Sequence, residues 1–133
     1  MNTKNLFTSV AAVCLLFGIT LALMPDYIGD KYLADPGMIN LGTRLVAQSY
    51  GSSLIAIAVA LGYAREAGPS VARKGLLFFV LLSNLALIVI NTLGILNGVE
   101  TPAAWLTVGI SVIFTVWSGM LLAQQENRAA SMG

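Results

Sequence analysis

The chain has 133 residues, of which 57% are apolar and only 10% are charged, and its mean hydropathy is +0.83. A soluble domain of this size needs more charge to cover its surface, so the composition indicates an integral membrane protein whose first partner is the lipid bilayer. The net charge of +1 excludes a broad basic surface for nucleic acid, and the length allows one domain over residues 1–133.

The charged residues divide the chain into four uncharged runs, at residues 5–25, 45–64, 75–99 and 101–125. Each run reaches the ~20 residues that a helix needs to cross the hydrocarbon core of a bilayer. In lipid a helix satisfies every backbone polar group within one segment, so we predict an all-α fold, an antiparallel bundle of four transmembrane helices. The expected helices lie at 5–24, 38–64, 72–97 and 102–125, with an outer loop at 25–37.

Residues that start and stop helices support these limits. Pro25 closes the first helix, and Asn97-Gly98 ends the third. The expected starts are Asp35-Pro36 for the second helix, Ser70 for the third and Thr101-Pro102 for the fourth.

The first helix carries Gly18 and Ala22, a small pair four residues apart that lets another helix approach closely. Its single cysteine, Cys14, cannot form an intramolecular disulfide, and we interpret it as a packing residue. In the outer loop, Tyr27 and Tyr32 would lie on one side of a helix at the membrane interface. The aspartates of this loop lack the spacing of a calcium loop, so we expect no metal site.

The second helix repeats polar and small residues every fourth position: Arg44, Gln48, Ser52, Ala56 and Ala60, with Gly51 nearby. We interpret Gly51, Ser52, Ala56 and Ala60 as a helix-packing surface. The alternative is a thin polar pathway that starts at Arg44. This arginine would either reach the headgroups or pair with an outer carboxylate, or contact an anion or substrate.

The third helix carries Asn84 and Asn91, two turns apart and therefore on one face. Lipid offers a side-chain amide no partner, so we expect both residues to face the interior of the bundle. The fourth helix has a stripe of hydroxyl residues, which includes Ser111 and Thr115. Together they predict a polar seam between the last two helices, held by interhelical hydrogen bonds or lining a pathway.

The positive charges predict the orientation. Five lie on one side of the predicted bundle, Lys4, Arg65, Arg73, Lys74 and Arg128, while only Lys31 and Arg44 lie on the other. Short loops with more Lys and Arg stay in the cytoplasm, so we expect both termini to be cytoplasmic, in the inner (plasma) membrane of a bacterium.

Several chemistries lack their residues. The chain has no histidine, which removes the commonest general base and metal ligand, so we expect no enzyme, no catalytic residue and no cofactor. Small multidrug exporters have four helices and need a carboxylate in the first, but residues 5–25 contain neither Asp nor Glu. Proton-driven transport in general lacks a carrier within the spans.

The plan resembles the small four-helix bacterial inner-membrane proteins of the DoxX-like type. The resemblance rests on Pro25 at the end of the first helix, the acidic outer loop, Arg44 followed by Gly51, and Trp105 opening the fourth helix. It implies an accessory membrane protein and transfers no catalytic residue.

Three functions stay open. We favour a non-enzymatic protein that forms a homo-oligomer or is an accessory subunit of a larger membrane complex. The alternative is a passive channel or transporter for a small solute or anion, with candidate residues Arg44, Gln48, Asn84, Asn91, Ser111 and Thr115. A further alternative is a binder of an apolar ligand, such as a quinone, lipid or pigment, between the helices.

Overall fold

The computed structural model describes residues 2–132, and side chains as far as residue 125. The side chain of Arg128, used above for orientation, lies outside the described residues. The regular secondary structure of the described residues is all helical, apart from one isolated bridge between Leu33 and Glu100. In chain order the elements are α1 Thr3–Leu23, α2 Pro25–Tyr32, η1 Pro36–Met38, α3 Leu41–Ala64, α4 Val71–Leu96, η2 Pro102–Ala104 and α5 Trp105–Met132.

Four helices are long and apolar enough to cross a membrane, which supports a multi-pass membrane protein. These spans are Thr3–Leu23, Leu41–Ala64, Val71–Leu96 and Pro102–Gln125. The predicted limits of the first three lie within three residues of the observed ones, because charged and helix-breaking residues set both.

The start of α3 differs from the prediction. Asp35 does accept a hydrogen bond at an N-cap, from the backbone N–H of Gly37, but it caps only the short turn η1. The N-cap of the long helix is Asn40, five residues later. Its side chain accepts from the N–H of Thr43, while the Thr43 hydroxyl accepts from the N–H of Asn40. This reciprocal capping box satisfies two backbone donors at once and fixes the helix start.

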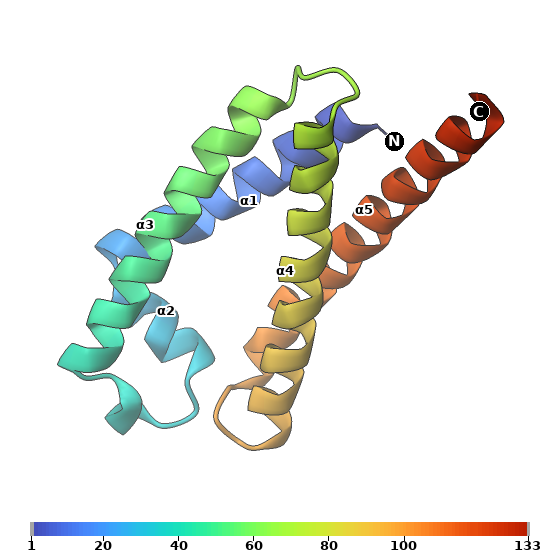
Figure 1. Cartoon of the computed structure of the whole chain (residues 1–133). Helices are drawn as coiled ribbons and strands as arrows, with labels where there is room; N and C mark the ends of the chain where they lie inside the picture. Colours follow the sequence, from blue (N-terminus) through green and yellow to red (C-terminus); the bar gives the residue numbers. More distant parts are fainter. Residues whose placement is uncertain (1, 133) are drawn as a thin grey trace.

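The long helices form two pairs (Figure 1): α1 packs along α3, and α4 packs along α5. Gly18 and Gly51 meet where α1 crosses α3, so closely that a Cβ on Gly51 would lie 2.7 Å from the Gly18 oxygen. Ala22 lies at the same contact, where that Cβ would be 2.7 Å from its backbone nitrogen. The small residues therefore permit backbone contact between α1 and α3.

The rest of the packing surface predicted on α3 is not buried in the structure. Ser52, Ala56 and Ala60 are exposed, and the helix instead buries Gly51, Ala58 and Leu61 against its neighbours. A repeat of exactly four residues drifts around a helix of 3.6 residues per turn, so its members do not share the contact with α1.

The two pairs share a core at the end of the molecule where the N-terminus and the α3–α4 connection lie (Figure 1). All four long helices contribute to this cluster of buried side chains: Leu6, Phe7, Val10, Leu61, Leu77, Val80, Phe114, Leu121 and Leu122. At the same end Lys4 pairs with Glu66 at 2.9 Å, and Arg73 donates to the Thr3 hydroxyl. We call this the inner end, and the end that carries α2 the outer end.

Candidate functional site

A cavity of about 980 Å³ separates the two helix pairs toward the outer end. Its walls are mostly apolar side chains, such as Phe17, Leu54 and Leu87. This volume lies at the upper end of the range for small-molecule sites, ~300–1,000 Å³. At the inner end the cavity stops at the shared core, because Val10 and Phe114 belong to both.

The outer end of the cavity is covered by α2 and the turn between α4 and α5. Three hydrogen bonds join these segments: Ala34 N–H to the Val99 oxygen, Thr101 N–H to the Tyr32 oxygen, and the Thr101 hydroxyl to the Lys31 oxygen. We call these three bonds the outer clamp. Sequence reasoning assigned Thr101 as a helix cap, but its hydroxyl makes no cap bond and holds α2 instead. The clamp keeps α2 over the cavity.

Both asparagines of α4 are buried and line the cavity, as expected from the cost of an amide in lipid. Their hydrogen bonds differ from the expected interhelical ones. The Asn84 side-chain nitrogen donates to the Val80 oxygen, and that of Asn91 donates to the Leu87 oxygen, each at 2.8 Å and four residues back on the same helix. Each NH₂ group thus uses one of its two N–H donors on its own helix, and each amide keeps its oxygen and a second N–H for a partner.

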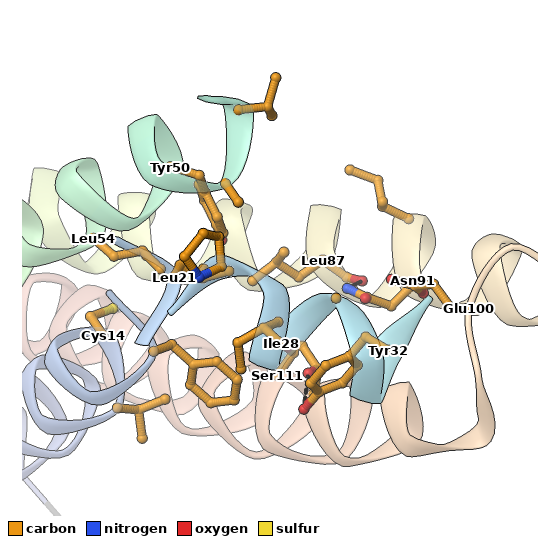
Figure 2. Close-up of a pocket in the computed structure, with 18 of the residues that line it drawn as sticks. Cys14, Leu21, Ile28, Tyr32, Tyr50, Leu54, Leu87, Asn91, Glu100 and Ser111 are labelled. Atoms are coloured by element: carbon orange, nitrogen blue, oxygen red, sulfur yellow. Dashed lines mark hydrogen bonds between the residues drawn. The ribbon is translucent and has the colours of Figure 1, made fainter. Parts of the chain in front are cut away.

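Glu100 also lines the cavity, although it was not predicted as a site residue. Figure 2 shows it at the same end of the cavity as Asn91, opposite Cys14. Its Oε2 is fully enclosed and has no hydrogen-bond partner among the described residues. Burial raises the pKa of this carboxyl above its ordinary value. The partly buried carboxyl group of Glu100 therefore lines the cavity without a partner for its Oε2 among the described residues, and this oxygen is packed against α4.

Gly94 makes room for this carboxyl group. A Cβ at position 94 would lie 2.6 Å from Oε2 of Glu100, so the side chain packs on the bare backbone of α4. The backbone N–H of Glu100 also donates to the Gly94 oxygen, at 3.1 Å. The short turn could have indicated this position from the sequence. Glu100 follows Leu96, the last residue of α4, by only four residues, so it stays within reach of the last turn of that helix.

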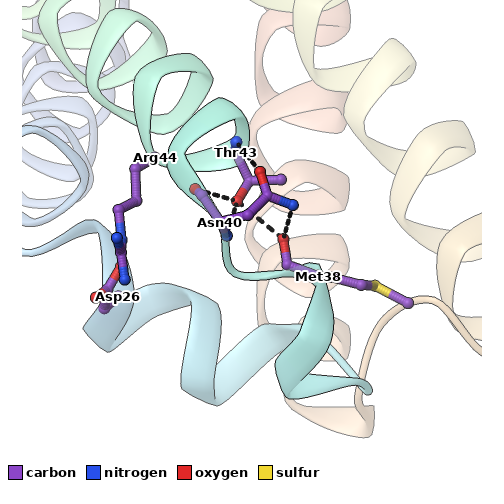
Figure 3. Close-up of polar contacts among 5 residues, drawn as sticks. All are labelled: Asp26, Met38, Asn40, Thr43 and Arg44. Carbon is purple, nitrogen blue, oxygen red and sulfur yellow. Dashed lines mark hydrogen bonds and ion pairs between the residues drawn. The ribbon is translucent and has the colours of Figure 1, made fainter.

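Arg44, which lines the cavity, is paired with Asp26 (Figure 3), and its Nε lies 2.8 Å from Oδ1 of the carboxylate. Both side chains are about half exposed, at 42% and 50%. The pair ties the start of α2 to the first turns of α3, and such a half-exposed pair contributes only about 0–1 kcal/mol. Of the outer carboxylates considered as partners for Arg44, the structure selects Asp26.

The structure brings together four of the six residues predicted to line a pathway, Arg44, Asn84, Asn91 and Ser111. Gln48 is exposed on α3 and does not line the cavity. Thr115 lies one turn beyond Ser111, toward the inner end, and its enclosed hydroxyl has no partner among the described residues. The tyrosines that line the cavity, Tyr32 and Tyr50, were not predicted as site residues. Tyr32 accepts a long hydrogen bond, of 3.4 Å, from the Thr107 hydroxyl.

Within residues 2–132 no group of three or more His, Cys, Asp or Glu side chains could hold a metal ion. The polar groups of the cavity are suited to binding: amide oxygens, hydroxyls, one ion pair and one unpaired carboxyl. No protein-family model, curated protein or solved structure matches the chain. The resemblance to DoxX-like proteins stays a prediction.

Proposed function

We propose that the protein is a non-enzymatic membrane protein that binds an amphiphilic molecule with a long apolar body in the cavity between its two helix pairs. The observation that carries the proposal is the cavity itself, about 980 Å³ in volume and lined mostly by apolar side chains with a few polar ones. An apolar body fits the wall, and a polar head fits the end where Asn91, Glu100 and Tyr32 lie (Figure 2).

The same geometry favours ligand binding over a passive channel. A pathway across the membrane must continue past the inner end of the cavity, where Phe7, Leu77 and Val80 are buried at 0% exposure. Those side chains belong to the core shared by all four long helices. Opening a route there would separate the two pairs and expose this core.

Filling the cavity tests the proposal. Ala47 lines the cavity from α3, so Ala47→Phe should exclude an amphiphile. Ala60→Phe is the matched control, because Ala60 is exposed on the same helix and does not line the cavity. Native mass spectrometry of the purified protein, incubated with dodecanol in phosphatidylcholine nanodiscs, counts bound molecules. We expect one dodecanol on the wild type and on Ala60→Phe, and none on Ala47→Phe. Equal occupancy of all three would contradict the proposal.

Self-association is a second candidate function, favoured by the outward face of α3. Gln48, Ser52 and Ala56 are exposed there, and the Gln48 amide is a polar group on the surface of a membrane-spanning helix. In a Cys14→Ser background, Ser52→Cys should form disulfide-linked dimers on oxidation if two copies meet at this face. Val89→Cys, exposed on α4, is the control. Monomers from both variants would reject the candidate.

We also propose that the helix pairs form one antiparallel bundle in the inner membrane of a bacterium, with both termini cytoplasmic. The support is the charge distribution: Lys4, Arg65 and Arg73 gather at the inner end, around the contacts with Glu66 and Thr3. Positive residues in short connections favour the cytoplasmic side.

A further inference from the structure

Resting on the proposed binding of an amphiphile, we propose that the head of this molecule is an ammonium group, held in the cavity by the carboxylate of Glu100 with the amide oxygen of Asn91 beside it.

The first step is the balance of charge. Among the residues that the structure describes, three charged side chains line the cavity: Asp26, Arg44 and Glu100. The first two pair with each other at 2.8 Å, which leaves Glu100 as the carboxylate whose charge is unmatched within the cavity. A bound cation supplies the missing opposite charge. An anionic head would instead meet this carboxylate, and like charges in a cavity of low polarity repel strongly.

The second step is hydrogen bonding. Oε2 of Glu100 is enclosed and lacks a donor among the described residues, and an enclosed acceptor without a donor is costly. Asn91 lies one turn before Gly94, the residue on which Oε2 packs, so the two acceptors share one face of α4. One N–H of Asn91 is used by the Leu87 oxygen, and the amide oxygen of Asn91 is an acceptor beside the carboxylate. An ammonium group is a donor only, and it matches this set.

The third step separates a single-chain amine from a phospholipid. A phospholipid head with an ammonium group also carries a phosphate, which needs cationic or N–H partners. The only cation lining the cavity in the described part of the chain is Arg44, which already pairs with Asp26. The cavity therefore fits an amine on an apolar body better than a zwitterionic lipid head.

The test compares three ligands that share one tail and differ in the head: dodecylammonium, dodecanol and dodecanoate. The full chain is purified in phosphatidylcholine nanodiscs, and native mass spectrometry measures which ligand occupies it from an equimolar mixture. A charge-assisted hydrogen bond is worth ~1.5–3 kcal/mol, so the wild type should prefer dodecylammonium over dodecanol by about tenfold or more. Dodecanoate should bind least.

Two variants assign the preference to Glu100. Glu100→Gln removes the charge and keeps the shape, so the preference for dodecylammonium should disappear while dodecanol still binds. Gly94→Ala keeps the charge but places a Cβ 2.6 Å from Oε2, which displaces the flexible end of the glutamate. It should lower the preference in the same direction. Asp30→Asn is the control, since this exposed carboxylate of α2 does not line the cavity.

The outcomes separate the two proposals. Equal binding of the three ligands, unchanged by Glu100→Gln, would overturn the ammonium assignment and leave amphiphile binding in place. A preference lost equally in Asp30→Asn would also overturn it, because general attraction to an acidic outer surface would then explain the result. Failure of every ligand to bind, or binding insensitive to Ala47→Phe, would refute the proposed function itself. Thermal unfolding of each variant shows that the folded protein was measured.

Discussion

Glu100 places a carboxyl group against α4, and burying this group costs free energy. Its Oε2 gives up water and gains no hydrogen bond from the described residues. Burial is the cause of its raised pKa. Glu66 shows the opposite case at the inner end, where the side-chain hydrogen bond and charge of Lys4 lower the pKa of an exposed carboxyl. One carboxyl is thus poised for a partner, while the other already has one.

Glu100→Gln should raise the stability of the ligand-free protein at pH 7. The native state holds the proton of Glu100 more tightly than the unfolded chain does, so stability rises as the pH falls from above the raised pKa toward 4.5, the ordinary value. At any pH above the raised pKa the charged form carries the full penalty, and removing the charge there should add about 1 kcal/mol for this partly exposed side chain.

The measurement is thermal unfolding of the wild type and the variant from pH 7 to pH 4. The difference between them isolates Glu100, because Glu66 and the other carboxyls titrate in both proteins. We expect this difference to shrink as the pH falls. A variant less stable than the wild type at pH 7 would show that the charge of Glu100 has a stabilising partner.

At the scale of the elements, the sequence predicted the end of a helix correctly where only one nearby residue could stop it. Pro25 and Gly98 are such cases, and Gly98 adopts a φ of 76° at the end of α4, which glycine accepts at little cost. The predicted start of α3 was wrong because Asp35 and Asn40 are both good N-cap residues. The choice depends on Thr43, which completes a capping box with Asn40 alone.

The close contact between α1 and α3 predicts that the stability of the protein depends strongly on Gly51. Gly51→Ala places a Cβ within 2.7 Å of two backbone atoms, in Ala22 and Gly18, and backbone moves away only with the helix. We expect a loss of about 1–3 kcal/mol in the free energy of unfolding. Gly62→Ala is the control, because nothing lies within 4 Å of its Cβ position on the same helix. It should be neutral or stabilising, by up to about 1 kcal/mol. Equal changes in stability for the two variants would show that α1 and α3 can move apart without loss of stability, against this prediction.

At the scale of the whole molecule, the sequence could predict four spans but not the cavity. Composition and charge spacing decide which segments enter a membrane, and they do so locally. The cavity depends on which helices pair, and small residues such as Gly18 and Gly51 indicate a close approach without naming the partner. It also depends on the outer clamp, where Thr101 bonds to residues about 70 positions away. The role of Glu100 follows from this tertiary arrangement.

The orientation of the molecule is the last prediction. The inner end gathers Lys4, Arg65 and Arg73, while the outer end holds the acidic α2. If the inner end faces the cytoplasm, a single cysteine at Asp30 should be open to the cell exterior and one at Gly68 should be hidden. Both positions are exposed, and Gly68 has nothing within 4 Å of its Cβ position.

The variants Asp30→Cys and Gly68→Cys are made in a Cys14→Ser background, because Cys14 is the only native cysteine. Intact bacteria are treated with a maleimide that does not cross membranes. Asp30→Cys should react at once, and Gly68→Cys only after permeabilisation, with the cysteine-free background as the blank. The reverse pattern would place the inner end outside. It would then put α2 and the Arg44–Asp26 ion pair on the cytoplasmic side of the membrane.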